Sequence, residues 1–220
     1  MISKTAQGKI NQGSAVRLMF EEGKILRKKL GADKVYDFSL GNPDQEPPEA
    51  IKKSLLNLAR SEEKGLHAYM SNQGYPDLRE KIAHFESVRN TVPMDPSCVT
   101  MTCGAAAGLN IVLHSLLDPG DEVLVLIPYF TEYPRYIEEA GGKAVLVRCD
   151  ADFRPDLEDL KAKITPKTKA LILNSPNNPS GVVYEAELLE KINAILLAQE
   201  QTIYPISDEV YRELIYDDRA

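Results

Sequence analysis

Short apolar runs and amphipathic stretches alternate along most of the chain. The apolar runs are nearly continuous, which is typical of strands covered on both faces of a parallel sheet. Gly, Pro, Asn or Asp lies at or near the end of most runs, as expected where strands end. Strands are therefore predicted over residues 99–103, 122–128, 143–149, 169–176 and 202–207.

Amphipathic stretches fill the segments between these strands. Apolar side chains recur there at intervals of three and four residues, which places them on one face of a helix. Helices are predicted over residues 104–117, 131–142, 156–164 and 185–200. This alternation predicts an α/β fold, with a mostly parallel sheet, right-handed crossovers and flanking helices.

The N-terminal part of the chain has a different organisation. An amphipathic helix is predicted over residues 14–30, and a short strand at 35–40 enters a Gly-Asn-Pro turn. Further helices are predicted from about Glu49 and from Pro76, because proline is favoured in the first turn of a helix.

Composition and charge narrow the functional classes. The 220 residues are 43% hydrophobic and 27% charged, as in soluble globular proteins. The 26 Lys and Arg against 33 Asp and Glu give a net charge of −7, which disfavours nucleic acid as a partner. Cys98, Cys103 and Cys149 lack C-x-x-C spacing, so neither a disulfide framework nor a zinc site is indicated, and a reducing cytoplasm is expected.

Signals for export, membrane insertion and metal binding are all missing from the sequence. The first 13 residues, MISKTAQGKINQG, lack the apolar region of a signal peptide, and the longest apolar run, 123–127, is too short to cross a bilayer. His67, His84 and His114 have no metal-ligand spacing. We therefore predict a cytoplasmic protein with no membrane partner and no metal.

Residues that follow the strands are the candidates for ligand binding, because ligands of open α/β sheets bind beyond the carboxyl ends of the strands. Small residues at 104–108 open a helix whose free backbone amides could hold a phosphate. Close packing of the helix on a strand explains them equally well. The chain contains no G-x-G-x-x-G or P-loop string, which disfavours nicotinamide and P-loop sites.

Two further strand ends carry polar side chains. The loop at 174–181, NSPNNPSG, is either a turn built from Pro and Asn or a device that aims the amide of Asn178 into the crevice. Asp208 follows the last strand and either caps a helix or pairs with a ligand. A carboxylate beside a ring nitrogen favours the protonated ring, which is what a pyridoxal cofactor needs as an electron sink.

Six motifs together resemble the class I/II, fold-type I, pyridoxal-phosphate-dependent aminotransferases. In chain order they are SLGNPD, YMSNQGYPDLRE, TCGAAAGL, DPGDEVLVLIPYFTEYP, NSPNNPSG and SDEVYREL. The resemblance covers the chain from about residue 35 to its last residue. It implies that residues 1–45 are a helix and strand segment of the small domain, and that 46–220 are a truncated large domain that binds pyridoxal 5'-phosphate.

The resemblance implies a role for several residues in holding the cofactor. Ala105 and Ala106 would bind its phosphate through their backbone amides, and Phe130 would stack on its pyridine ring, a contact suited to a flat cationic ring. Asp208 would pair with the ring nitrogen. Asn178 would donate a hydrogen bond to the phenolic oxygen of the cofactor.

Three more residues are assigned by the same resemblance. Tyr211 would approach the phenolic oxygen, and Gly41 would contact the substrate α-carboxylate through its backbone. Tyr69 would reach the cofactor phosphate of a neighbouring subunit, which implies a homodimer. The alternative for Phe130, Tyr69 and Tyr211 is an ordinary place in the core.

The lysine that binds the cofactor as a Schiff base lies downstream of the SDEVY motif in the family. No lysine follows Asp208 in this chain, so no catalytic residue is assigned. That amine serves both as the covalent anchor and as the base that moves the substrate proton. We therefore expect the N-terminal part of an aminotransferase that is inactive alone. By the family's strand order, the strand at 99–103 would be separated from the other four, which leaves a gap with unpaired backbone groups.

The expected reaction is transfer of an amino group between an amino acid and a 2-oxo acid. A C–S β-lyase of the same fold is the enzymatic alternative, because it shares the cofactor motifs. A non-catalytic pyridoxal-phosphate-binding regulatory module is the other alternative, although no DNA-binding head is visible. The sequence does not identify the amino acid substrate.

Overall fold

The computed structural model describes residue 2, residue 7, residues 15–39, residue 41, residues 46–214 and residue 216. The chain divides into two compact units, Met1–Tyr69 and Met70–Ala220, and each is described by itself. The predicted boundary near residue 45 lies beside residues outside the described part and stays a prediction.

Helices make up the regular structure described in the first unit. They are α2 (Ala15–Leu30), the short 3-10 helix η1 (Ala32–Lys34) and α3 (Glu49–Arg60), as the sequence predicted except for η1. The predicted strand at 35–40 is wrong for its described residues, 35–39, which form no strand. Val35 has extended backbone angles, but an extended segment becomes a strand only when a neighbour pairs with it.

The second unit contains the sheet and its helices. Its strands are β1 (Glu122–Leu126), β2 (Lys143–Val147), β3 (Thr168–Asn174) and β4 (Tyr204–Asp208). Its helices are α4 (Pro76–Asn90), η2 (Pro96–Cys98), α5 (Ala105–Leu116), α6 (Tyr133–Glu139), α7 (Leu157–Lys163) and α8 (Ala186–Leu197). The predicted helices are confirmed with shorter bounds, most of all the helix predicted over 131–142, of which α6 covers Tyr133–Glu139.

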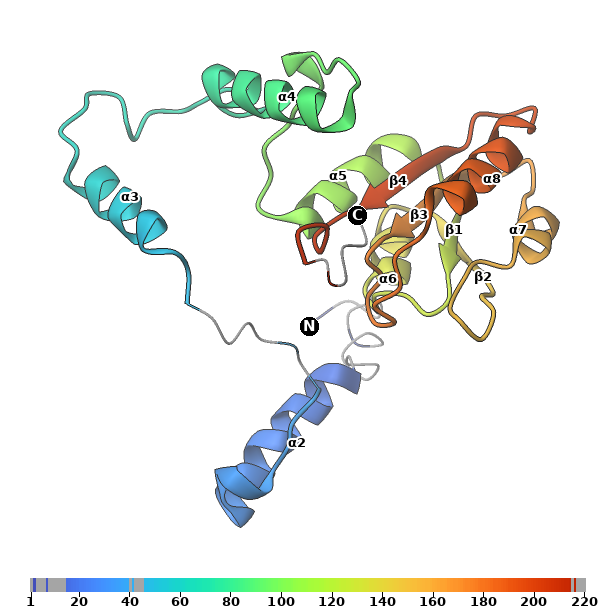
Figure 1. Ribbon diagram of the computed structural model, residues 1–220, viewed down its shortest axis with the longest axis horizontal. Coiled ribbons are helices and arrows are strands. Elements are labelled where there is room, and N and C mark those ends of the chain that lie inside the picture. The colour runs from blue at the N-terminus through green and yellow to red at the C-terminus, as the bar shows by residue number, and fades with distance from the viewer. Residues whose placement is uncertain are drawn as a thin grey trace. The chain divides into compact units, whose positions relative to one another are not determined.

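The sheet is fully parallel, with the strand order β2-β1-β3-β4 (Figure 1). Consecutive strands of the chain are joined by helices, as parallel pairing requires. The α/β prediction is therefore confirmed. The carboxyl ends of β3 and β4 lie side by side, with Asn174 paired to Asp208, and Leu171 is paired to Pro205 further along the strands.

Alternation along the strands divides the core into two layers. Leu124 and Leu126 of β1 face α7 and α8, where they pack with Leu160 and Ile192. The intervening residues of β1, together with β3, pack on the other face against α5 and α6 through Leu109, Leu113, Tyr133 and Ile137. Helices therefore cover both faces of the sheet, as the continuous apolar runs predicted.

The predicted strand at 99–103 is wrong, because these residues join no sheet. The backbone amide of Met101 instead donates to the carbonyl of Gln73 at 2.9 Å. The sheet consists of the other four strands, and the outer edge of β4 pairs with no strand among the described residues. This arrangement agrees with the predicted separation of residues 99–103 from the sheet.

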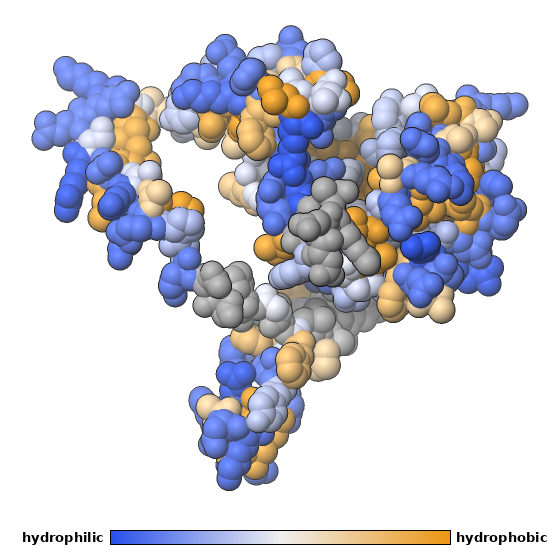
Figure 2. All heavy atoms as spheres, viewed as in Figure 1, coloured by the Kyte–Doolittle hydropathy of each residue, from blue (hydrophilic) through white to orange (hydrophobic). Residues whose placement is uncertain are grey.

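Large apolar side chains are exposed on the helices of both units, and Figure 2 shows apolar surface over α3 and over α4. On α3, Leu55 and Leu58 are exposed, and this helix buries no residue at all. On α4, Phe85 and Val88 are likewise exposed. None of the described helices is long and apolar enough to cross a membrane.

A buried carboxylate fixes α7 to the end of β2. Asp159 accepts hydrogen bonds from the backbone amide of Arg148 at 2.8 Å and from the ammonium of Lys163 at 2.6 Å. The guanidinium of Arg148 adds a contact at 3.1 Å. The amide of Arg148, followed by Lys163, lowers the pKa of Asp159 from 3.8 to about 2.

Replacement of Asp159 by Asn should make unfolding less sensitive to acid. A lowered pKa in the folded state stabilises the fold above pH 3.8, and this contribution is lost as the pH falls through about 2. Asp159→Asn should therefore flatten the dependence of the unfolding midpoint on pH between these values. Urea melts at several pH values measure this slope. Glu158→Gln, which removes an exposed carboxylate from the same helix, is the control, and an equal flattening there would contradict the prediction.

The open edge of β4 and the exposed apolar helices predict low stability for the isolated chain. Unpaired strand edges and apolar patches favour association with other chains. Urea unfolding should show either a shallow transition at a low midpoint or a midpoint that rises with protein concentration. A steep, concentration-independent transition with an ordinary free energy of unfolding, about 5–15 kcal/mol, would contradict this.

Candidate cofactor site

The candidate site is built at the carboxyl ends of β3 and β4. These strands bring Asn174 and Asp208 into direct register. The side-chain amide of Asn174 donates to the backbone carbonyl of Asp208 at 2.8 Å, so the main chain carrying Asp208 is held from the neighbouring strand. Asn174 was not among the predicted site residues. The signal that could have identified it is its position, since it is a polar residue at the end of an apolar strand.

Asp208 has two carboxylate oxygens in different situations. Its Oδ2 accepts a hydrogen bond from the hydroxyl of Tyr133 at 2.6 Å. Its Oδ1 is buried and has no hydrogen-bond partner within the described part of the chain. A buried carboxylate oxygen without a partner is costly, so it indicates a place where a ligand donates a hydrogen bond.

Tyr133 of α6, which contacts Asp208, packs against Phe130 from the loop before this helix. The ring of Phe130 lies edge-on to that of Tyr133, with centroids 5.6 Å apart and an angle of 77° between the planes. Phe130 is half-buried, whereas Tyr133 is 2% exposed. Burial, together with the hydrogen bond to Asp208, raises the pKa of Tyr133 far above its ordinary value, so its hydroxyl remains a proton donor.

The loop after β3 holds the predicted Asn178 against Tyr211. The backbone amide of Asn178 donates to Oδ1 of Asn174 at 2.7 Å. Its side-chain amide then donates to the hydroxyl of Tyr211 at 2.9 Å. Asn174 therefore links both predicted polar residues, Asn178 and Asp208, to one point of the sheet.

Ion pairs anchor the turn that carries Tyr211. The guanidinium of Arg212 contacts the carboxylate of Glu86 on α4 at 3.1 Å, and Arg89 of the same helix pairs with Glu213. The hydrogen bond from Arg212 lowers the pKa of Glu86, which keeps that carboxylate ionised. The position of Tyr211 is thus set by β4 on one side and by α4 on the other.

The first turn of α5 presents backbone amides without side-chain caps. Gly104 precedes the helix with φ of 83°, a conformation that side chains rarely adopt, and a Cβ there would meet open space. The following residues, Ala105 and Ala106, are exposed. The amides of a first helical turn have no partner inside the helix, and they carry the positive end of its dipole.

The structure brings together four of the predicted residues. Asp208, Asn178, Tyr211 and Phe130 are connected through Asn174 and Tyr133. No described contact joins Ala105 or Ala106 to Asp208, although α5 and α6 share one core layer. The other two predicted residues belong to the first unit: Gly41 is exposed, and Tyr69 is fully exposed.

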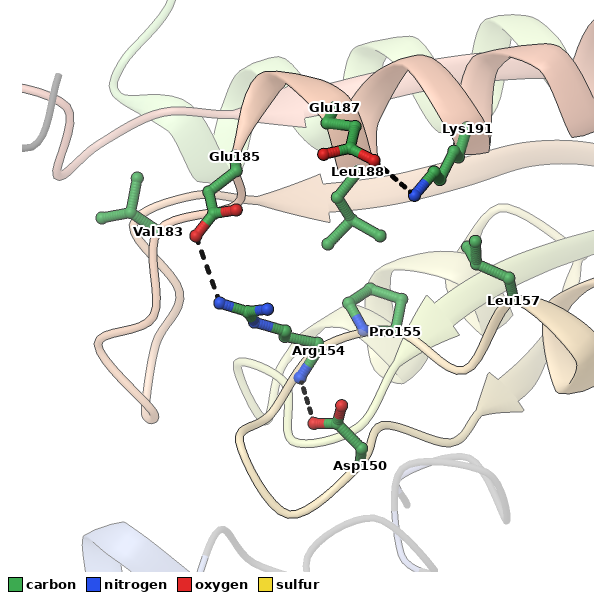
Figure 3. A pocket seen from close by; sticks show the side chains of 9 residues that line it. All are labelled: Asp150, Arg154, Pro155, Leu157, Val183, Glu185, Glu187, Leu188 and Lys191. Carbon is green, nitrogen blue, oxygen red and sulfur yellow. Dashed lines mark hydrogen bonds and ion pairs between the residues drawn. The ribbon is translucent and has the colours of Figure 1, made fainter.

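A separate surface pocket of about 250 Å³ lies between the loop after β2 and the start of α8 (Figure 3). Four of its charged groups form two ion pairs, since Arg154 contacts Glu185 at 3.1 Å and Lys191 contacts Glu187 at 2.7 Å. The fifth, Asp150, accepts a hydrogen bond from the backbone amide of Arg154 at 2.9 Å. None of the residues connected to Asp208 lines it. Among the described residues, no group of His, Cys, Asp and Glu could hold a metal ion.

Comparison with known proteins places these residues in a family. Residues 33–220 match the model of aminotransferase class I and II. A probable aspartate/prephenate aminotransferase of Aquifex aeolicus is 40% identical over 90% of this chain and 49% of its own length. The aspartate/prephenate aminotransferase of Thermus thermophilus is 38% identical over 86% and 48%, respectively.

Solved structures agree with the sequence matches. The crystal structure of an amino transferase from Eubacterium rectale superposes with a TM-score of 0.94 and 35% identity, covering all of this chain and 57% of that protein. The chain thus spans about half the length of the relatives it matches. The family model covers most of the chain and the sheet has the same architecture, so this chain belongs to the class I and II aminotransferases.

Proposed function

We propose that the chain is the cofactor-binding part of an aminotransferase that uses pyridoxal 5'-phosphate to move an amino group between an amino acid and a 2-oxo acid. The observation that carries this proposal is Oδ1 of Asp208, which is buried and has no hydrogen-bond partner among the residues that the structure describes. A protonated pyridine nitrogen is a donor of the right chemistry for that oxygen. When bound, this cofactor withdraws electrons from the substrate carbon that loses its proton.

Asp208 would bind the ring nitrogen and favour its protonated form, because a buried carboxylate stabilises an adjacent cation. Phe130 would stack on the ring, and its half-buried position beside Tyr133 supports this. Asn178 and Tyr211, which are already hydrogen-bonded to each other, would share the phenolic oxygen.

Ala105 and Ala106 would hold the phosphate through their backbone amides. The uncapped first turn of α5 and the open space at Gly104 support this assignment. Gly41 would contact the substrate carboxylate through its backbone. For Tyr69, complete exposure supports a role in a second subunit, and we propose a homodimer in which each site uses both chains.

The amine required for transfer would come from outside these 220 residues. Among the described residues, no hydrogen bond or ion pair links a lysine to Asp208, Asn178 or Tyr211. The names of the two relatives, both aspartate/prephenate aminotransferases, favour an acidic amino acid as the amino donor, and they favour amino transfer over C–S elimination. Three unpaired thiols support a reducing compartment such as the cytoplasm.

Loss of the carboxylate of Asp208 should weaken cofactor binding strongly. The Kd of pyridoxamine 5'-phosphate is measured by equilibrium dialysis. This form of the cofactor has no aldehyde, so it forms no imine with surface lysines. Asp208→Asn should raise Kd about 30-fold or more, since it removes the charge of a buried pair worth about 2 kcal/mol or more. Asp152→Asn, in an exposed loop, is the matched control and should not change Kd. Equal affinities of the wild type and Asp208→Asn would refute the assignment.

Borohydride trapping tests whether the amine lies elsewhere. The chain is incubated with pyridoxal 5'-phosphate, reduced, digested and mapped by mass spectrometry. We expect only scattered low labelling that excess pyridoxamine 5'-phosphate does not suppress, and no transamination by the chain alone. Stoichiometric labelling of one lysine, suppressed by that competitor, would show that the amine is in this chain.

A further inference from the structure

Tyr133 has a hydroxyl group whose only described partner is the candidate cofactor carboxylate. Its oxygen lies 2.6 Å from Oδ2 of Asp208, a residue 75 positions away in the sequence. The ring itself is held by the apolar core layer of α5 and α6, where it is 2% exposed. A phenylalanine would therefore fill the same space, so the hydroxyl serves Asp208 rather than the packing.

The main chain of Asp208 is already fixed. It is paired in β4 to β3, and its carbonyl accepts from Asn174 at 2.8 Å. The remaining freedom is rotation of the carboxylate, and the hydrogen bond from Tyr133 restricts that rotation. This hydrogen bond occupies Oδ2, whereas Oδ1 is buried and has no partner in the described part of the chain.

The protonation state of the Tyr133 phenol follows from its surroundings. Burial first, then the hydrogen bond to Asp208, raises the pKa of Tyr133, and the nearby Tyr211 and Tyr136 act in the same direction. The phenol therefore donates its proton to the hydrogen bond at all ordinary pH values. A donor hydrogen bond favours an ionised carboxylate over the protonated acid.

We propose that Tyr133 is a positioning residue for cofactor binding: its hydroxyl occupies Oδ2 of Asp208 and leaves Oδ1 free for the ring nitrogen, and it thereby keeps the shared proton on that nitrogen. This inference rests on the proposed pyridoxal-phosphate site. Without the hydroxyl of Tyr133, Oδ2 of Asp208 loses its hydrogen-bond donor. The carboxylate of Asp208 then competes more strongly with the ring nitrogen for the proton that they share.

The test follows the ring nitrogen directly. Pyridoxamine 5'-phosphate labelled with ¹⁵N in the ring is bound to the 220-residue chain, and its ¹⁵N chemical shift is measured at pH 8 with Kd from dialysis. In the wild type we expect the shift of a protonated ring. Tyr133→Phe should move the shift towards that of the neutral ring and raise Kd about three- to tenfold.

Tyr184→Phe is the control, because it removes the hydroxyl of another tyrosine, 5% exposed, from the opposite core layer. It should leave both the ¹⁵N shift and Kd unchanged, and near-UV circular dichroism should show all variants equally folded. An unchanged ring shift in Tyr133→Phe would overturn the role of Tyr133 while the cofactor site stands. The proposed function itself would be overturned if the wild-type chain bound no pyridoxamine 5'-phosphate, or bound it with an unprotonated ring nitrogen.

Discussion

The buried carboxylate of Asp208 is the constraint on which the rest of the site depends. A buried charge at the carboxyl end of β4 is tolerated only if its oxygens find donors. The protein supplies one donor, from Tyr133, and holds the backbone from Asn174. The other oxygen has no donor among the described residues. The site therefore lacks one hydrogen-bond donor, at Oδ1, and the ligand that binds there has to supply it.

The parallel sheet makes this arrangement possible. All four strands end at one edge, so the last residue of β3 and the last residue of β4 become neighbours although they lie 34 positions apart in the sequence. Helices on both faces bury most of β1 and β3, and Asn174 and Asp208 at the ends of β3 and β4 are buried as well, which lowers the local dielectric. Hydrogen bonds at this edge are accordingly stronger, and the positions of Asn178 and Tyr211 are set by a few contacts with rigid elements.

Much of the fold was visible in the sequence because hydrophobic periodicity is a local signal. The four strands of the sheet and all the longer helices follow it. The errors, at 35–39 and 99–103, are segments with strand-like residues that pair with no strand among the described residues, and the presence of a partner depends on the whole chain. Asp208 and Asn178 were predictable from their places after strands. Tyr133 was not, because its role depends on a hydroxyl meeting a carboxylate 75 residues away.

The proline in β4 affects how the sheet meets other chains. Pro205 has no backbone N–H, so it cannot act as a donor in a hydrogen-bond ladder, and prolines are tolerated chiefly in edge strands. The exposed side of β4 therefore offers an interrupted template to any passing extended segment. Pairing with arbitrary extended segments, and growth into fibrils, are therefore disfavoured at this edge. A partner strand that needs no hydrogen bond from position 205 can still pair with it.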